Sequence, residues 1–238
     1  MSSDVSAPSR KVDRRFYGLV GVGVLALILW GFGKTYYFKA AFGTPALPTL
    51  LQVHGAVMTT WFLLFIVQAF LVSERRVDLH RRLGLFGGLV ALAVLVVGTT
   101  TALTAARLGH APPGPPPLVF LVVPLGDMVV FATLVGVGLA YRKRTDIHKR
   151  LLLLSCVGML GAAIARIPIE ALAKAGPLAY FGITDLLLLG CLACDRVKTG
   201  RFHPAFSWGA AFVILSHPAR LMLGGTALWM SLARWMAG

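Results

Sequence analysis

Ionisable side chains that interrupt long apolar runs are the residues of this chain best placed to do chemistry. They are His54, Asp127, Arg166, Glu170, Asp185, His217 and Arg220. An ionisable group in hydrocarbon costs at least about 2.5–3.5 kcal/mol on insertion scales, so such groups are normally paired with one another or used in a function. The sequence therefore predicts a polar site inside a largely apolar domain.

The charged members of this set are predicted to form one intramembrane network. Arg166 and Glu170 are four residues apart, and His217 and Arg220 are three apart, so each pair lies on one face of a helix. A proline beside each pair should bend that helix. The network consists of Asp127, Arg166, Glu170, Asp185 and Arg220. Two interpretations stay open: the charges only fix helix packing, or they line a pocket that relays protons or binds a ligand.

A second group of candidates comes from a repeated heptapeptide. The stretch VDLHRRL at 77–83 returns as TDIHKRL at 145–151, and His203 begins a third apolar run in the same way. Neutral imidazoles on neighbouring helices suit zinc, copper or iron as ligands. The metal or haem candidates are His54, His80, His148, His203 and His217.

Haem b is the other cofactor that histidines on separate helices suggest, because two imidazoles at similar depth can bind its iron from opposite sides. The candidate pairs are His80 with His148, and His54 with His217. A different interpretation of the loop-boundary histidines is that they anchor the helices at the lipid headgroups, where neighbouring aspartates cap the helix that follows.

The elements that must position these side chains are transmembrane helices. Hydrophobic residues make up 57% of the chain and charged residues 13%, and the mean hydropathy is +0.78. About 20 apolar residues are needed to cross roughly 30 Å of hydrocarbon. Seven stretches qualify: 17–33, 48–72, 83–104, 118–141, 150–171, 177–195 and 206–230. We predict an all-α fold, with a disordered cytoplasmic tail at 1–15 and a single seven-helix transmembrane domain at 16–238.

Positive charge gathers on one side of this bundle. The formal net charge is +14, and sixteen lysines and arginines lie in the N-terminal tail and in the loops after the second, fourth and sixth spans, against five on the other side. The positive-inside rule therefore predicts a cytoplasmic N-terminus and a C-terminus outside. The lipid bilayer accounts for the charge, so no nucleic-acid partner is expected.

Spacing also predicts an internal repeat. His80, His148 and His203 each begin a helix after a basic loop, and an arginine follows the second by 18 residues and the third by 17. We expect three related hairpins, formed by spans 2–3, 4–5 and 6–7, after the first helix. Parallel repeats of this kind are related by an axis along the membrane normal.

Several of these stretches carry a family resemblance. LQVHGAVMTTWFLLFIVQAFLV, DLHRRLG, DIHKRLLLL and FHPAFSWG resemble a family of uncharacterised bacterial multi-pass inner-membrane proteins, over roughly residues 17 to 230. The resemblance implies a helical fold and the bacterial inner membrane, but no activity. A looser likeness links the chain to membrane b-type cytochromes, which place histidines deeper within their spans than this chain does.

Three functional classes fit these residues. The first is a redox or metal-dependent membrane protein that uses the histidines to hold haem or a transition metal. The second is a proton-coupled small-molecule transporter that uses the charge network. The third is a non-catalytic subunit or assembly factor of a membrane complex, acting with a membrane-protein partner or as a homo-oligomer.

Overall fold

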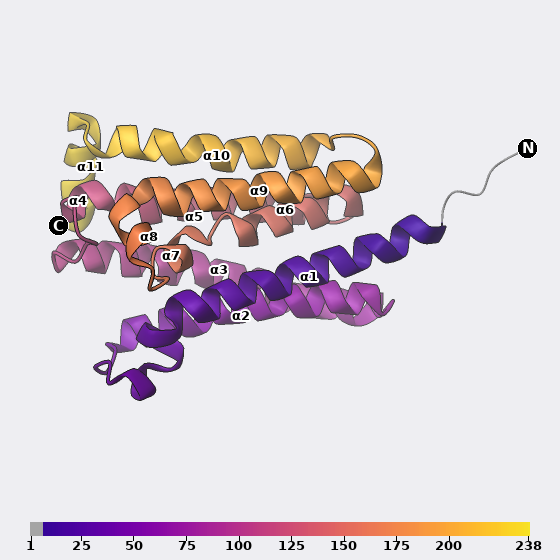
Figure 1. The fold of residues 1–238 in the computed structure, drawn as a ribbon, viewed down its shortest axis with the longest axis horizontal. Coiled ribbons are helices and arrows are strands. Elements are labelled where there is room, and N and C mark those ends of the chain that lie inside the picture. Colours follow the sequence, from indigo (N-terminus) through magenta and orange to yellow (C-terminus); the bar gives the residue numbers. More distant parts are fainter. Residues whose placement is uncertain (1–6) are drawn as a thin grey trace, which may run out of the picture.

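Helices make up all the regular structure of the protein. The structure is a computed structural model that describes residues 7–238, with side chains from residue 16 onward, and no strand occurs in this range. The long helices are α1 (Ala7–Phe32), α2 (Thr49–Ser73), α3 (Val77–Arg107), α5 (Val122–Ala140), α6 (Thr145–Val157), α9 (Pro177–Thr199) and α10 (Pro204–Gly224). The short helices are α4 (Pro117–Phe120), α7 (Gly161–Ile164), α8 (Glu170–Ala175) and α11 (Ala227–Ala237). The long helices lie side by side along the long axis of the molecule (Figure 1).

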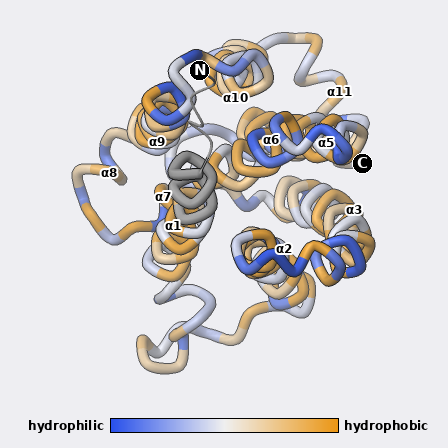
Figure 2. Tube along the Cα trace, turned by 90° about the vertical axis from the view of Figure 1, so that its right-hand side faces the viewer, coloured by the Kyte–Doolittle hydropathy of each residue, from blue (hydrophilic) through white to orange (hydrophobic). Residues whose placement is uncertain are grey.

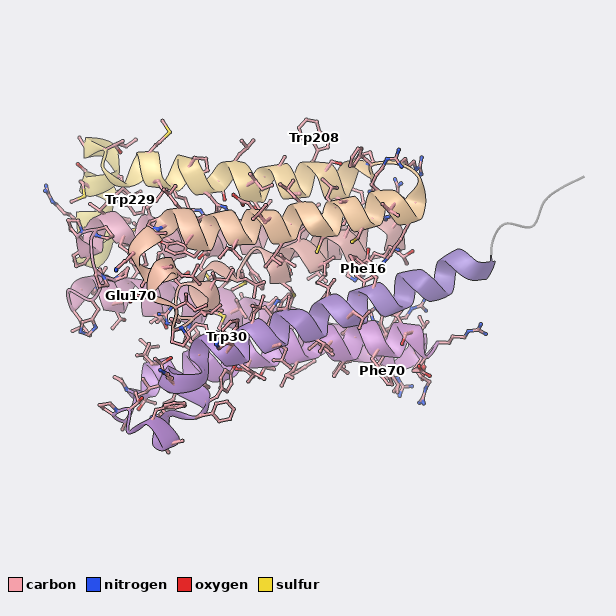
Figure 3. The ribbon with its side chains drawn as sticks, viewed as in Figure 1. Phe16, Trp30, Phe70, Glu170, Trp208 and Trp229 are labelled. Carbon is pink, nitrogen blue, oxygen red and sulfur yellow. The ribbon has the colours of Figure 1, made fainter. Side chains whose placement is uncertain are left out.

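Six stretches of the described chain are long and apolar enough to cross a membrane, and the bent pair α10 and α11 is a seventh candidate. The six are Phe16–Tyr37, Thr49–Ser73, Val77–Arg107, Pro117–Ala140, Thr145–Ile164 and Pro177–Thr199. Hydrophobic residues occur along all the long helices (Figure 2), and many of them are exposed on the outside, such as Leu85 at 80% and Leu178 at 81%. Trp208 points away from the helices (Figure 3). Such an apolar exterior is suited to lipid, which confirms the prediction of an all-α membrane bundle.

Helix α6 is the most enclosed of the long helices. Its residues from Arg150 to Val157 are buried apart from Leu152, and the helix contacts α5, α9 and α10 as well as α1 and α2. Leu153 and Leu154 are fully buried in the same core as Phe131 of α5 and Phe206 of α10. Polar groups on α5, α6, α9 and α10 can therefore meet inside the protein.

The span expected over 150–171 ends earlier than predicted, because the stretch that can cross a membrane is Thr145–Ile164. Helix α6 passes through a turn at 158–160 into the single turn of α7, and the chain is helical again only from Glu170. Pro168 explains the second break, because it has no N–H to donate and disfavours helical geometry in the residue before it. Ile169 is extended, with φ −121°. Arg166 and Glu170 therefore do not share a helix face.

The stretch expected as one span over 206–230 is bent beyond Pro218, which lies inside α10. The axes of α10 and α11 meet at 86°, at a break that contains Gly225 and Thr226. The Thr226 hydroxyl caps α11 by accepting a hydrogen bond from the backbone N–H of Trp229 at 3.2 Å. The indole Nε1 of Trp229 donates to the carbonyl of Leu118 in α4 at 2.8 Å. Helix α11 therefore packs beside α4 at one end of the bundle (Figures 1 and 3).

The first span ends in one turn of π-helix, η1 (Gly33–Tyr37), followed by a 3₁₀ turn, η2 (Lys39–Phe42). The turn places two tyrosines against α2: the Tyr36 hydroxyl donates to the carbonyl of Gln52 at 2.9 Å, and the Tyr37 hydroxyl lies 2.7 Å from the Thr59 hydroxyl. The span expected over 17–33 thus continues to Tyr37. Of the tail expected at 1–15, residues 1–6 lie outside the described residues, and α1 includes the rest.

Candidate functional site

A buried ion pair joins α5 to α10. One guanidinium nitrogen of Arg220, Nη1, donates to Oδ1 of Asp127 and to the carbonyl of Val123, while Nη2 donates to the Ser216 hydroxyl at 2.7 Å. Gly126 makes room for the arginine, because a Cβ at this position would lie 2.4 Å from Arg220 Cδ. The glycine therefore permits the close approach of the two helices at the ion pair.

A second pair lies one helical turn away on α10. The imidazole Nδ1 of His217 is 2.8 Å from Oδ1 of Asp185 in α9. The same imidazole stacks on the ring of Phe181, with 4.2 Å between centroids and 13° between planes. The guanidinium carbon of Arg220 lies 5.8 Å from the centroid of that ring. Phe181 therefore contacts both basic groups and joins the two pairs into one arrangement.

We call Asp127, Asp185, His217 and Arg220 the α10 cluster. The two basic side chains are 3% and 5% exposed, whereas the two carboxylates are 24% and 23% exposed. With a neutral imidazole the cluster holds two negative charges and one positive, so it takes up one proton to become neutral. Charges interact strongly where water is excluded, and interacting groups titrate together as one unit. The cluster can therefore hold one exchangeable proton, with access through the carboxylates.

Three of the predicted site residues lie apart from this cluster. Arg166 donates to the carbonyl of Ala162 at 2.9 Å and lies over the Phe32 ring, 4.9 Å from its centroid. Nδ1 of His54 on α2 is buried and has no hydrogen-bond partner among the described residues. Glu170 is exposed, and its ion-pair partner is Lys174 at 2.7 Å. The predicted five-residue network is thus divided, with Asp127, Asp185 and Arg220 in one place and Arg166 and Glu170 elsewhere.

The two copies of the heptapeptide bring His80 and His148 together. Their ring centroids are 6.4 Å apart and their planes are at 83°. Nδ1 of His148 is 2.8 Å from the carbonyl oxygen of Gly138. A carbonyl only accepts, so this Nδ1 carries the proton and Nε2 is left with a free lone pair. Nδ1 of His80 is buried and has no hydrogen-bond partner among the described residues.

A third polar contact region, which sequence reasoning missed, joins α6 to α9 and α10. Arg150 binds both carboxylate oxygens of Asp195, through Nε at 3.0 Å and Nη2 at 2.7 Å, and the two side chains are 4% and 2% exposed. His203 Nε2 is 3.1 Å from Oδ2 of Asp146. The sequence pattern placed Arg150 among the loop cations. The available signal was Asp195, an isolated acid at the end of the apolar run 177–195.

The predicted histidine ligands fall into separate places. His217 belongs to the α10 cluster, His80 faces His148, and His203 pairs with Asp146. No group of three or more His, Cys, Asp or Glu side chains within residues 16–238 is placed to hold a metal ion. A cavity of about 470 Å³ lies between α1 and the helices α6 and α9, and apolar residues such as Val24, Leu27 and Leu187 line it. That cavity does not contain the α10 cluster.

Fold and site together define a polytopic helical membrane protein with ionisable pairs inside its bundle. Comparison with protein-family models, with curated proteins and with solved structures finds no match.

Proposed function

We propose that the protein is a proton-coupled carrier of the membrane, in which the α10 cluster binds and releases the proton that drives movement of a small solute. The observation that carries the proposal is the charge of the cluster: two carboxylates, one permanent cation and one titratable base, which together are neutral only with one extra proton. Ionisable residues inside a membrane domain are the usual components of proton relays.

The contacts of the cluster support a division of roles between its two pairs. Arg220 stays charged at every physiological pH, so the pair with Asp127 is a fixed ion pair. The 2.8 Å hydrogen bond between His217 and Asp185 can hold a proton on either side. Pro218 lies in α10 between the two bases and removes one backbone hydrogen bond from the helix. A change of charge at His217 therefore acts on the part of α10 that has one backbone hydrogen bond fewer.

The proposed carrier has a defined arrangement in the membrane. We infer seven crossings with α10 as the last, a cytoplasmic N-terminus, and a location in the bacterial inner membrane. The local geometry of the two heptapeptides supports the hairpin repeat. Each begins a helix, and in each an arginine just before the helix lies near its aspartate: Arg76 is 4.0 Å from Asp78, and Arg144 is 3.8 Å from Asp146. In a carrier such repeats enclose the binding site.

Proton movement in reconstituted vesicles tests the function. Proteoliposomes are loaded with the pH dye pyranine, and a potassium diffusion potential, negative inside, is imposed. Proton entry is recorded without solute and with a fixed panel of amino acids, sugars and small carboxylic acids outside. We expect protein-dependent acidification in at least one condition. It should be lost in Asp185→Asn and Asp127→Asn, because each amide leaves the cluster neutral without a proton.

Glu170→Gln is the matched control, since it also turns a carboxylate into an amide, but at an exposed position paired with Lys174. It should keep the wild-type rate. Absence of protein-dependent acidification in every condition, or equal rates in wild type and Asp185→Asn, would rule out the carrier. Recovery of a stoichiometric membrane-protein partner together with absent flux would instead identify a subunit of a larger complex.

A further inference from the structure

We propose that His80 and His148 bind one copper ion in its monovalent form, Cu(I), between their imidazole rings, at the end of the bundle where α3 and α6 begin. This site is separate from the α10 cluster, and the proposal does not depend on proton-coupled transport.

The spacing of the two rings fits one ion held between them. A zinc ion lies about 2.0–2.1 Å from an imidazole nitrogen, and that nitrogen is about 1.1 Å from the centre of its own ring, so two rings on opposite sides of an ion at this distance have centroids about 6.3 Å apart. The observed distance between the His80 and His148 centroids is 6.4 Å. Rings in direct packing contact would instead allow any centroid distance from about 4.5 Å to 7 Å.

The hydrogen bonds of the two rings leave the right atoms available. Histidine ligands usually donate their second ring N–H to a carbonyl or carboxylate, which fixes the tautomer and the ring orientation. His148 does so through Nδ1 to the carbonyl of Gly138, which leaves Nε2 for the metal. On His80, Nδ1 is buried and has no partner in the described structure. Gln68 holds this first turn of α3 in place by donating to the His80 carbonyl at 3.2 Å.

The ligand count and the charge of the site select Cu(I). Zinc takes four ligands in a structural site and at least three from the protein in a catalytic one, whereas this place offers two imidazoles and no third His, Cys, Asp or Glu within the described residues. Two neutral nitrogens in line are sufficient for Cu(I), which carries one charge and accepts low coordination. Arg81 directly follows His80 in the sequence, and a nearby cation opposes a divalent ion more than a monovalent one.

Competition for Cu(I) tests the site. Purified protein in detergent is titrated without oxygen against the copper-binding dye bicinchoninate, and the stoichiometry and affinity are measured. We expect one tightly bound Cu(I) per chain, with affinity at least tenfold weaker in His80→Gln and in His148→Gln. His110→Gln is the matched control, because His110 is an exposed histidine of the loop before α4, and it should bind copper as wild type does.

X-ray absorption of the copper-loaded wild type gives a readout that needs no variant. Two nitrogen neighbours at one short distance support the proposal, and sulfur neighbours or three or more ligands overturn it. His80→Gln should fold normally, since the backbone carbonyl of residue 80 still accepts the hydrogen bond from Gln68. Wild-type protein that does not compete for Cu(I), or unchanged affinity in folded His80→Gln, also overturns it. A haem Soret band that both variants abolish would assign the pair to haem instead.

Discussion

The buried pair of Arg150 and Asp195 is the sharpest test of how this bundle is held together. Three hydrogen bonds leave the guanidinium, two of them to the carboxylate and one, at 2.8 Å, to the carbonyl of Asp146. Asp195→Ala removes two of the three and leaves a cation with 4% of its side chain exposed. Breaking a buried pair from one side costs about 3–5 kcal/mol, because the remaining charge is uncompensated.

Two further variants separate the effect of the Arg150 and Asp195 charges on stability from the effect of side-chain shape. Asp195→Asn keeps one oxygen acceptor in the same place, so it should lose about one charged hydrogen bond, about 1.5–3 kcal/mol. The double replacement Arg150→Met with Asp195→Leu removes both charges and keeps apolar volume. It should recover most of the loss, because replacing a whole buried pair by packed apolar side chains is often neutral.

Reversible unfolding of the purified protein by SDS in mixed micelles, followed by tryptophan fluorescence, gives the free energy of unfolding for each variant. Glu170→Gln provides the comparison for an exposed carboxylate and should cause no measurable change, as expected for surface ion pairs. A cost below about 1 kcal/mol for Asp195→Ala, or a double replacement that costs as much as Asp195→Ala alone, would refute this account of the buried pair.

Two glycines give further predictions. Gly126→Ala should move Arg220 away from Asp127, because the new Cβ would lie 2.4 Å from Arg220 Cδ. We expect about 1–3 kcal/mol of destabilisation and slower proton entry in the vesicle assay. An unchanged rate would contradict a role of the Arg220–Asp127 pair in proton entry. Gly31→Ala should destabilise the packing of α1 on α7 by a similar amount, because its Cβ would meet a backbone carbonyl at 2.1 Å. Gly23→Ala, which meets nothing within 4 Å, should be neutral or slightly stabilising in the same unfolding measurement.

The membrane helices could be predicted from the sequence because length and hydropathy decide them locally. The stretches expected at 48–72 and 177–195 correspond to α2 and α9 within a few residues at each end. The departures lie where local backbone chemistry overrides hydropathy. The largely apolar stretches continue past Pro168, and past Gly224 and Gly225, so a pattern of apolar residues does not show where the helix stops.

Which acidic and basic side chains pair inside the bundle could be predicted only in part. Sequence position gives the depth of a residue along a helix, and it indicated that acids and bases lie at similar heights. It does not give rotation about the helix axis or the choice of neighbouring helix. Arg150 shows this limit, because it lies in a basic heptapeptide whose first copy has Arg82 exposed at the same place. Arg150, in the second copy, is buried because α6 lies at the centre of the bundle.

The π-helical turn at the end of α1 lets the chain contact α2 at two places that an uninterrupted α-helix could not bring to the same side. The backbone N–H of Phe38 bonds to the carbonyl of Gly33, five residues earlier, so this turn holds one residue more than an α-helical turn. Upstream, Gly21 packs against α2 at Ile66; downstream, Tyr36 and Tyr37 bond to the same helix. Deleting one residue from 33–37 would rotate one contact by about 100° relative to the other. The extra residue therefore changes the rotation of the chain about the helix axis, so that α1 and the π-helical turn both contact α2 at two different heights.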